Sequence, residues 1–261
     1  MPTIRAAFFD IDGTLLPFGH DRMPAPTVAA LQALRRRGVG VYIATGRPPV
    51  DIDFLTALRA VEFDGFVTMN GQYCYERDPD APFYSHPMPP EALRALVPWL
   101  AGKHLPVAFL ERGFTYANCA EATGNGIVEP DVPVLDPVRA LTRTTYQPSA
   151  FISPEWEGEF LRHCPGCVAV RWNDQFADIL PAGGGKDAGL RAMLAHKGLD
   201  PAQAIAFGDA RNDIPMLRAA GIGVAMGNAD DAVKAAADFV TAADVDDGIG
   251  KALRKMGLVL N

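Results

Sequence analysis

The sequence has few cysteines, no long apolar run and no excess of positive charge. Its 261 residues include four cysteines, too few for the disulfide framework of a small secreted domain. No stretch reaches the roughly 18 uninterrupted apolar residues of a membrane span, and acids occur too early in the first segment for a signal peptide. The net charge of −7 gives no basic excess to neutralise a phosphodiester backbone. These absences predict a soluble, cytoplasmic protein that binds neither nucleic acid nor a membrane.

Two familiar metal-site patterns are also absent. Cys164 and Cys167 form a C-x-x-C beside His163, but no second C-x-x-C or H-x-x-x-H follows to complete a zinc site. Two reduced thiols at a Pro-Gly turn explain the pair better. None of the five histidines belongs to an H-E-x-x-H pattern, so a zinc hydrolase of that kind lacks its ligands.

The length and the apolar content predict one to two domains with a sizeable core. At about 150 residues per domain, 261 residues leave room for a second unit, and 49% of them are hydrophobic. Short apolar runs alternate with segments of helical spacing at both ends of the chain, which predicts right-handed crossovers and a parallel sheet. The predicted strands are Ile4–Phe9, Val39–Ala44, Phe66–Met69, Ala204–Gly208, Gly223–Met226 and Phe239–Thr241. The predicted helices between and after them are Thr27–Arg37, Asp51–Ala60, Asp187–Lys197, Asn212–Ala220, Asp230–Ala236 and Gly248–Lys255.

The pattern changes in the middle of the chain. A proline-rich stretch leads into a predicted helix, and two hairpin signals follow with another helix between them. The helices are Glu91–Lys103 and Pro154–His163, and the paired strands are Val107–Leu110 with Phe114–Ala117 and Val168–Trp172 with Ala177–Leu180. We therefore predict a discontinuous α/β domain, a doubly wound parallel sheet of Rossmann-like type over residues 1–81 and 183–261, with an α+β unit inserted at 82–182.

Polar residues end four of the predicted strands. They are Asp10, Thr45, Asn70 and Asp209. In open α/β sheets ligands bind beyond the carboxyl ends of the strands, so we expect these side chains to meet. Asp12 and Asp213 add carboxylates near two of these strand ends. Oxygen-only ligands with room for water and a phosphate oxygen are what Mg²⁺ prefers, so the pattern favours a magnesium site.

Lys186 follows three consecutive glycines, Gly183–Gly185. Taken alone, this lysine is best explained as a surface residue after a flexible hinge. The segment is not a P-loop, because Leu180 occupies the position of the first glycine of G-x-x-x-x-G-K-[ST] and Asp187 follows the lysine. A cradle for a nucleoside triphosphate is therefore not supported.

Together, these segments resemble the four ordered motifs of the haloacid dehalogenase superfamily. The matching segments are Asp10-Ile11-Asp12-Gly13-Thr14, Thr45-Gly46-Arg47, Lys186 and Gly208-Asp209-x-x-Asn212-Asp213. The inserted unit resembles the large α/β cap of the Cof-type sugar-phosphate phosphatases. Asn70-Gly71 and Gly227-Asn228-Ala229 lie where that branch often carries similar elements.

The resemblance implies a magnesium-dependent phosphomonoester hydrolase for small phosphorylated metabolites, such as sugar phosphates or pyridoxal phosphate. It implies that Asp10 is the nucleophile that becomes an aspartyl-phosphate and that Asp12 is the general acid and base. The implied metal ligands are Asp10, the main-chain carbonyl of Asp12 and Asp209, with Asp213 in support. The implied phosphate contacts are Thr45, the amides of Ile11 and Gly46, Lys186 and Asn212. The implied cap closes over the site and selects the leaving group.

Other candidate residues lie further from the reacting atoms. Arg47 and Asn70 could meet the rest of the substrate, although an ordinary salt bridge or loop hydrogen bond explains them equally well. Arg112, Phe114 and Trp172 of the predicted hairpins are cap candidates that packing or surface exposure explains more simply. No heptad run or apolar stripe marks a partner surface, so a monomer and a small homo-oligomer are both expected states.

Two other functions remain as alternatives. Phosphomannomutases look similar, but a mutase returns the phosphoryl group to a bound bisphosphorylated sugar, so phosphate release without a bisphosphate activator separates the two. A non-catalytic metabolite sensor would be expected to lack the nucleophile or the acid, and both Asp10 and Asp12 are present. Dehalogenation is disfavoured because it does not use the acid that Asp12 supplies.

Overall fold

The chain divides into two compact units, which are described separately. The computed structural model describes residues 3–101, 105–123, 128 and 130–260. The first unit comprises Met1–Arg47, Asp51–Ser85 and Gly185–Asn261, and the second comprises Pro48–Val50 and His86–Gly184.

The first unit is built on one mixed sheet, in which the described residues form eight strands. In spatial order these are β13 (Phe239–Val240), β12 (Ile222–Ala225), β11 (Ala204–Gly208), β1 (Ala6–Phe9), β2 (Gly40–Ala44), β3 (Gly65–Thr68), β4 (Tyr73–Tyr75) and β5 (Tyr84–Ser85). Strands β13 to β3 pair in parallel, and β4 and β5 pair antiparallel. Phe9, the last residue of β1, is in register with Phe207 on one side and Ile43 on the other. The carboxyl ends of the central strands therefore lie at one edge, as predicted for this α/β fold.

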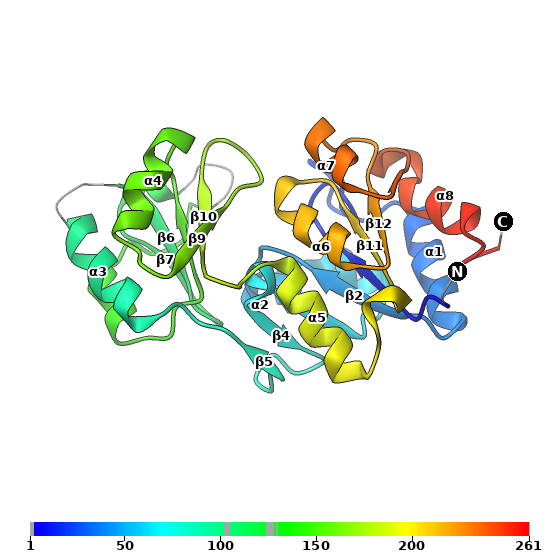
Figure 1. The fold of residues 1–261 in the computed structure, drawn as a ribbon, viewed down its shortest axis with the longest axis horizontal. Coiled ribbons are helices and arrows are strands. Elements are labelled where there is room, and N and C mark those ends of the chain that lie inside the picture. The colour runs from blue at the N-terminus through cyan, green and yellow to red at the C-terminus, as the bar shows by residue number, and fades with distance from the viewer. Residues whose placement is uncertain (1–2, 102–104, 124–127, 129, 261) are drawn as a thin grey trace. The chain divides into compact units, whose positions relative to one another are not determined.

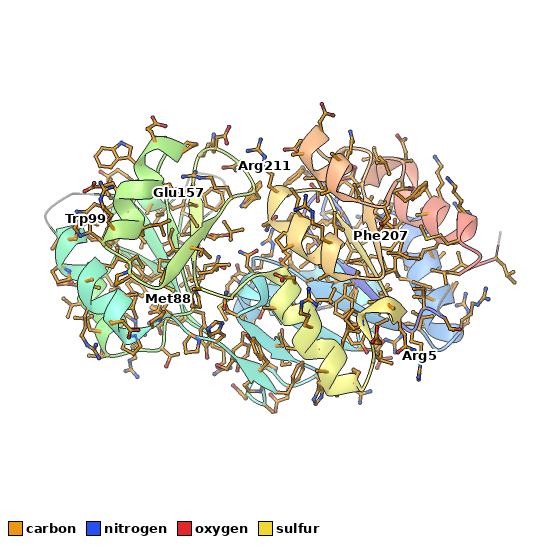
Figure 2. All side chains as sticks on the ribbon, in the orientation of Figure 1. Arg5, Met88, Trp99, Glu157, Phe207 and Arg211 are labelled. Carbon is orange, nitrogen blue, oxygen red and sulfur yellow. The ribbon has the colours of Figure 1, made fainter. Side chains whose placement is uncertain are left out.

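Helices cover both faces of this sheet (Figure 1). Helices α1 (Ala25–Arg36) and α8 (Gly248–Lys255) pack on one face, and α5 (Lys186–Lys197), α6 (Ile214–Ala219) and α7 (Asp231–Ala236) pack on the other. Phe207 of β11, labelled in Figure 2, is fully buried in the first of these layers. Burial on both faces explains why the central strands read as continuous apolar runs.

This unit differs from the sequence prediction mainly at one helix and at two strands. The predicted helix Asp51–Ala60 is instead α2 (Pro49–Phe54) followed by a 3₁₀ turn at Thr56–Ala60, because Leu55 between them has φ −74° and ψ 84°. Strands β4 and β5 were not predicted. They follow a chain reversal at which Met69 and Asn70 both have positive φ, and three and two residues are too short for a periodic signal.

The second unit is an antiparallel sheet with two main helices. The strand order is β7 (Thr115–Ala117), β6 (Val107–Leu110), β8 (Gln147–Ala150), β10 (Ala177–Pro181) and β9 (Cys167–Val170). Helices α3 (Pro90–Ala101) and α4 (Pro154–Arg162) contribute to one apolar cluster with this sheet. Both predicted hairpins are present, but the central strand β8 was not predicted, because Gln147-Pro148-Ser149-Ala150 has no β-branched or aromatic residue. The predicted end of the first helix at Lys103 lies outside the described residues.

Several 3₁₀ turns complete the described elements. They are Met69–Gly71, Ala120–Ala122, Pro137–Leu141, Pro201–Gln203, Arg211–Asp213 and Asp244–Asp246.

Candidate active site

The polar residues that end the parallel strands meet at one edge of the sheet. Asp10 follows β1, and its backbone N–H donates to the Phe207 carbonyl at the end of β11 over 3.1 Å. The Asn70 N–H donates to the Thr45 carbonyl over 2.9 Å, which joins the ends of β2 and β3. The juxtaposition expected from the sequence is therefore present at this edge.

A cluster of acidic residues surrounds a buried lysine there. Carboxylate oxygens of Asp10, Asp209 and Asp213 lie within 4.8 Å of one another. Lys186 begins helix α5, and its side chain is fully buried. Its Nζ donates to Asp10 Oδ1 over 2.7 Å and to Asp213 Oδ1 over 2.6 Å. Three carboxylates and one ammonium leave two negative charges without a partner of opposite sign in the cluster.

Burial and the neighbouring charges raise the pKa of Asp10, Asp209 and Lys186 in different proportions. Burial raises the pKa of Asp10 well above its usual value, and Asp213 and Asp209 add to this while Lys186 opposes it. Burial and the neighbouring Asp213 raise the pKa of Asp209 to about 7. Burial alone would lower the pKa of Lys186, but the Asp10 and Asp213 carboxylates outweigh it and raise that pKa. A divalent cation would offset this repulsion, so the donor set fits Mg²⁺.

Local backbone geometry positions the carboxylates. Asp213 Oδ2 accepts the backbone N–H groups of Asp209 and Ala210, each at 3.0 Å. Thr14 Oγ1 donates to Asp209 Oδ1 over 2.7 Å. Gly13 has φ +78°, and a Cβ there would lie 2.3 Å from Asp209 Oδ2. Only glycine fits between the loop after β1 and Asp209 without displacing the carboxylate.

Asp12 is paired with Arg47 on the solvent side of the site. The Arg47 guanidinium donates from Nε to Asp12 Oδ2 and from Nη2 to Asp12 Oδ1, each over 2.8 Å. The side chains are 36% and 32% exposed for Arg47 and Asp12 respectively. The sequence left Arg47 between a substrate contact and an ordinary salt bridge, and the structure places it in a bidentate pair with the predicted acid and base.

The remaining predicted phosphate contacts are buried, apart from Gly46, which is half-buried. Thr45 is 1% exposed, and its hydroxyl accepts the Arg47 backbone N–H over 3.1 Å. Asn212 Nδ2 donates to Asn70 Oδ1 over 3.0 Å. A Cβ at Gly46 would lie 3.2 Å from Asn70 Nδ2, so the chain packs tightly there. Ile11, whose amide is the other predicted contact, directly follows Asp10 and has a fully buried side chain.

Two residues support the site in ways that sequence reasoning did not assign. Thr14 stood in the first motif without a role, and its hydroxyl orients Asp209. Asn228 donates through Nδ2 to the Gly13 carbonyl over 2.8 Å and accepts the Asp244 backbone N–H at 3.1 Å. Its place in Gly227-Asn228-Ala229 was the available signal, but nothing in the sequence showed which loop it would hold.

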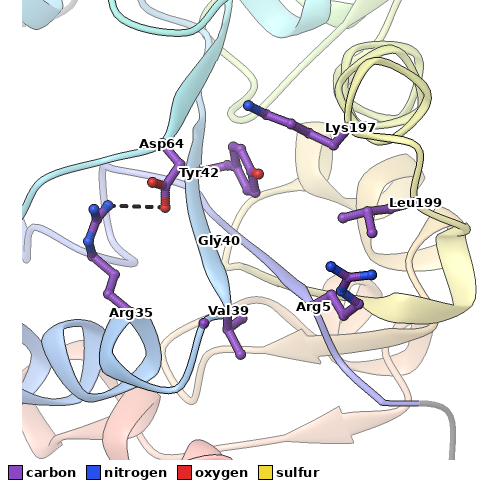
Figure 3. A pocket seen from close by; sticks show the side chains of 9 residues that line it. Arg5, Arg35, Val39, Gly40, Tyr42, Asp64, Lys197 and Leu199 are labelled. Atoms are coloured by element: carbon purple, nitrogen blue, oxygen red, sulfur yellow. Dashed lines mark ion pairs between the residues drawn. The ribbon is translucent and has the colours of Figure 1, made fainter.

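A separate pocket of about 320 Å³ lies at the beginning of β2. None of the predicted site residues lines it. Figure 3 shows Arg35 paired with Asp64 beside this strand, at 3.0 Å, and Lys197 above Tyr42. Lys197 pairs with Glu76 at 2.6 Å. Two of the basic residues in the lining, Arg35 and Lys197, therefore have acidic partners, and Arg5 also lines the pocket.

Comparisons with known proteins agree with this geometry. The family model of the haloacid dehalogenase-like hydrolases matches residues 7–253. The chain belongs to this family. The prediction of a hydrolase with this α/β fold is therefore confirmed.

Relatives within the family extend the comparison. Pyridoxal phosphate phosphatase YbhA of Escherichia coli (strain K12) is 31% identical over 270 residues, covering 95% of this chain and 97% of the relative. The structure of the subclass IIB sugar phosphatase BT4131 is 35% identical with a TM-score of 0.86, covering 98% of this chain and all of that one. The structure of the phosphatase BT1666 from Bacteroides thetaiotaomicron is 32% identical with a TM-score of 0.89, covering 98% and 96%.

Within the described part of the chain, no helix has the length and apolar character to span a membrane.

Proposed function

We propose that this hydrolase is a magnesium-dependent phosphatase that cleaves small phosphomonoesters, such as sugar phosphates or pyridoxal phosphate, through a covalent phosphoryl group on Asp10. The observation that carries the proposal is the buried Asp10 carboxylate at the end of β1, held by Lys186 at 2.7 Å beside two further carboxylates. The class of substrate is supported by two relatives, since YbhA is described as a pyridoxal phosphate phosphatase and BT4131 as a sugar phosphatase.

The cation would be held by Asp10, Asp209 and the main-chain carbonyl of Asp12. Asp10 and Asp209 each use Oδ1 for a hydrogen bond to the protein, and no hydrogen bond among the described residues uses their Oδ2 atoms. Both oxygens of Asp213 already accept hydrogen bonds, so Asp213 supports the site by fixing Lys186 and the Asp209 loop. When bound, Mg²⁺ screens the repulsion between the anionic nucleophile and the anionic phosphate.

The first half-reaction transfers the phosphoryl group to Asp10. A carboxylate oxygen of Asp10 attacks phosphorus as the bond to the alcohol oxygen breaks, and Asp12 in its acid form gives that oxygen a proton. The Lys186 ammonium and the Thr45 hydroxyl bind the equatorial oxygens, together with the amides of Ile11 and Gly46 and the side chain of Asn212. These donors stabilise the charge of the transition state.

The second half-reaction returns the enzyme to its starting state. Asp12, now a carboxylate, takes a proton from water as the water oxygen attacks phosphorus and the bond to Asp10 breaks. The two hydrogen bonds from Arg47 orient the Asp12 carboxylate for this step. Before Asp12 can donate a proton in the first step, at least one of its hydrogen bonds to Arg47 must break. Both side chains are partly exposed to solvent, which leaves room for that change.

The test is inorganic phosphate release from a panel of sugar, nucleotide and cofactor phosphates, with Mg²⁺ or with excess chelator, and without a bisphosphate activator. We expect Mg²⁺-dependent release from one or a few members. Asp10→Asn should abolish turnover and leave the circular dichroism spectrum unchanged. Wild-type activity in Asp10→Asn would overturn the mechanism, and product isomerisation that requires a bisphosphate would assign a mutase instead.

A further inference from the structure

The C-x-x-C segment of the second unit has no part in the phosphoryl-transfer site. Cys164 follows His163, the C-cap residue of helix α4, and Cys167 begins β9, the edge strand of its sheet. Gly166 between them has φ +74°, which reverses the chain in a tight turn. The turn therefore joins the end of α4 to the edge strand β9. It brings Cys164 and Cys167, three residues apart in the sequence, near each other.

The two cysteines lie on either side of this turn, at the same apolar cluster. Cys164 is fully buried and belongs to the apolar cluster of the unit, whereas Cys167 is partly exposed and packs against that cluster. Cys167 Sγ also lies 3.8 Å from the Pro165 carbonyl oxygen, across the turn. The arrangement gives one sulfur that solvent reagents can reach and one that only its partner can reach.

The surroundings shift the pKa values of the two thiols in opposite directions. The hydrogen bond from Cys164 lowers the pKa of Cys167, although burial and Glu91 oppose the change. The same hydrogen bond, with burial, raises the pKa of Cys164. The helix end gives an independent reason, because Cys164 lies at the negative end of the α4 dipole, which disfavours its thiolate. Cys167 is therefore the better nucleophile of the pair.

The other two cysteines provide internal comparisons. Cys74 is buried in the first unit, and its burial raises its pKa. Cys119 is partly exposed, like Cys167, but burial and the neighbouring Glu121 raise its pKa. Among the four cysteines, Cys167 alone combines access to solvent with a lowered pKa.

We propose that Cys164 and Cys167 form a redox-active pair that low-molecular-weight disulfides convert to an intramolecular disulfide. The Cys167 thiolate attacks one sulfur of the small disulfide R–S–S–R and releases one RS⁻. Cys164 then loses its proton and attacks Cys167 Sγ, which forms the Cys164–Cys167 bond and releases the second RS⁻. The two protons from the protein thiols appear on two molecules of RSH, so the pair is oxidised by two electrons and the small disulfide is reduced by two.

A zinc site explains this turn less well than a dithiol does. The nearby imidazole of His163 stacks on Trp99 with ring centroids 4.5 Å apart, and its Nε2 lies 3.6 Å from Glu159 Oε1. Trp99 is labelled on helix α3 in Figure 2. The described residues contain a group of possible metal ligands in the acidic cluster of the first unit, and these cysteines are not part of it. Two thiols alone do not complete a tetrahedral site.

The experiment titrates the full-length reduced protein with mixtures of oxidised and reduced glutathione in buffer that contains a chelator. Samples are quenched with acid, alkylated and analysed by mass spectrometry. We expect the wild type and Cys119→Ser to lose two alkylatable thiols together, with a Cys164–Cys167 peptide lighter by two hydrogen atoms. Before oxidation, Cys167 should be alkylated faster than Cys119, as expected for the thiol with the lower pKa.

Single-cysteine variants separate the two steps. Cys164→Ala, which keeps an apolar side chain in the core, should retain one glutathione on Cys167 as a mixed disulfide. Cys167→Ser should keep Cys164 reduced under the same conditions, and the circular dichroism spectrum of each variant checks its fold. Four alkylatable thiols in the wild type, under conditions that oxidise a thioredoxin control, would overturn the proposal. Equal alkylation rates for Cys119 and Cys167 would also overturn it. So would a parallel titration without chelator in which a bound zinc ion protects both thiols until chelator is added.

Discussion

Replacing Lys186 with methionine tests the electrostatics of the site. The Lys186 side chain has no exposed surface, and its ammonium donates to Asp10 at 2.7 Å and to Asp213 at 2.6 Å. Methionine keeps most of the side-chain volume but leaves two buried carboxylates without a cation. Removing one partner of a buried ion pair costs about 3–5 kcal/mol, so we expect Lys186→Met to lower the free energy of unfolding by about that amount in the absence of divalent cations.

Lys197→Met is the matched control on the same helix. Lys197 is 27% exposed and pairs with Glu76 at 2.6 Å, and such a surface pair contributes less than about 1 kcal/mol. Urea denaturation of both variants in chelator measures the difference. The loss in Lys186→Met should shrink as the pH falls, because protonation of Asp10, whose pKa burial already raises, removes one of the unpaired charges. A loss within about 1 kcal/mol of the Lys197→Met loss would refute this account of the cluster.

Three further perturbations follow from the site. Gly13→Ala should destabilise the protein by about 1–3 kcal/mol more than Gly19→Ala in thermal denaturation and weaken activation by Mg²⁺, since both have φ +78° but only Gly13 faces Asp209 Oδ2. The metal-free protein should lose stability as the pH rises from about 4 to about 7, because folded Asp209 then holds a proton that the unfolded chain has released. Asp209→Asn should flatten that pH dependence in denaturant titrations, and a slope unchanged by this variant would contradict it. Arg47→Ala should slow hydrolysis of phosphorylated Asp10 by about tenfold or more in single-turnover assays, whether an alkyl or an aryl phosphate formed it, since its bonds orient Asp12 for that step. A fall confined to alkyl phosphates would assign Arg47 to proton donation to the leaving group instead.

The sequence was sufficient for the core fold and for the meeting of the site residues. Strands buried on both faces give continuous apolar runs, and a parallel sheet brings the residues that follow them to one edge. Asp10, Thr45, Asn70 and Asp209 could therefore be grouped before any geometry was known. The chemical roles of these residues stay predictions until the assays are done.

The sequence was not sufficient where short segments or long-range contacts decide the structure. Strand β8 has the sequence Gln147-Pro148-Ser149-Ala150, and its pairing with β6 and β10 on either side outweighs its weak local preference. The Asp12–Arg47 pair joins two motifs 35 residues apart, and the sequence could not distinguish it from a substrate contact. Lys186 alone resembled a surface lysine, and only the fold shows its two buried acidic partners.

The covalent step on Asp10 is tested most directly with an Asp12→Asn variant and p-nitrophenyl phosphate. This leaving group departs without a general acid, but hydrolysis of the phosphorylated enzyme still lacks its base. We predict a burst of one p-nitrophenolate per enzyme molecule, followed by very slow turnover, with a phosphoryl group on the Asp10 peptide after acid quench. The burst and the phosphorylated peptide should both be absent in the variant that also carries Asp10→Asn. Steady turnover without a burst, or a phosphoryl group on any other residue, would contradict the mechanism.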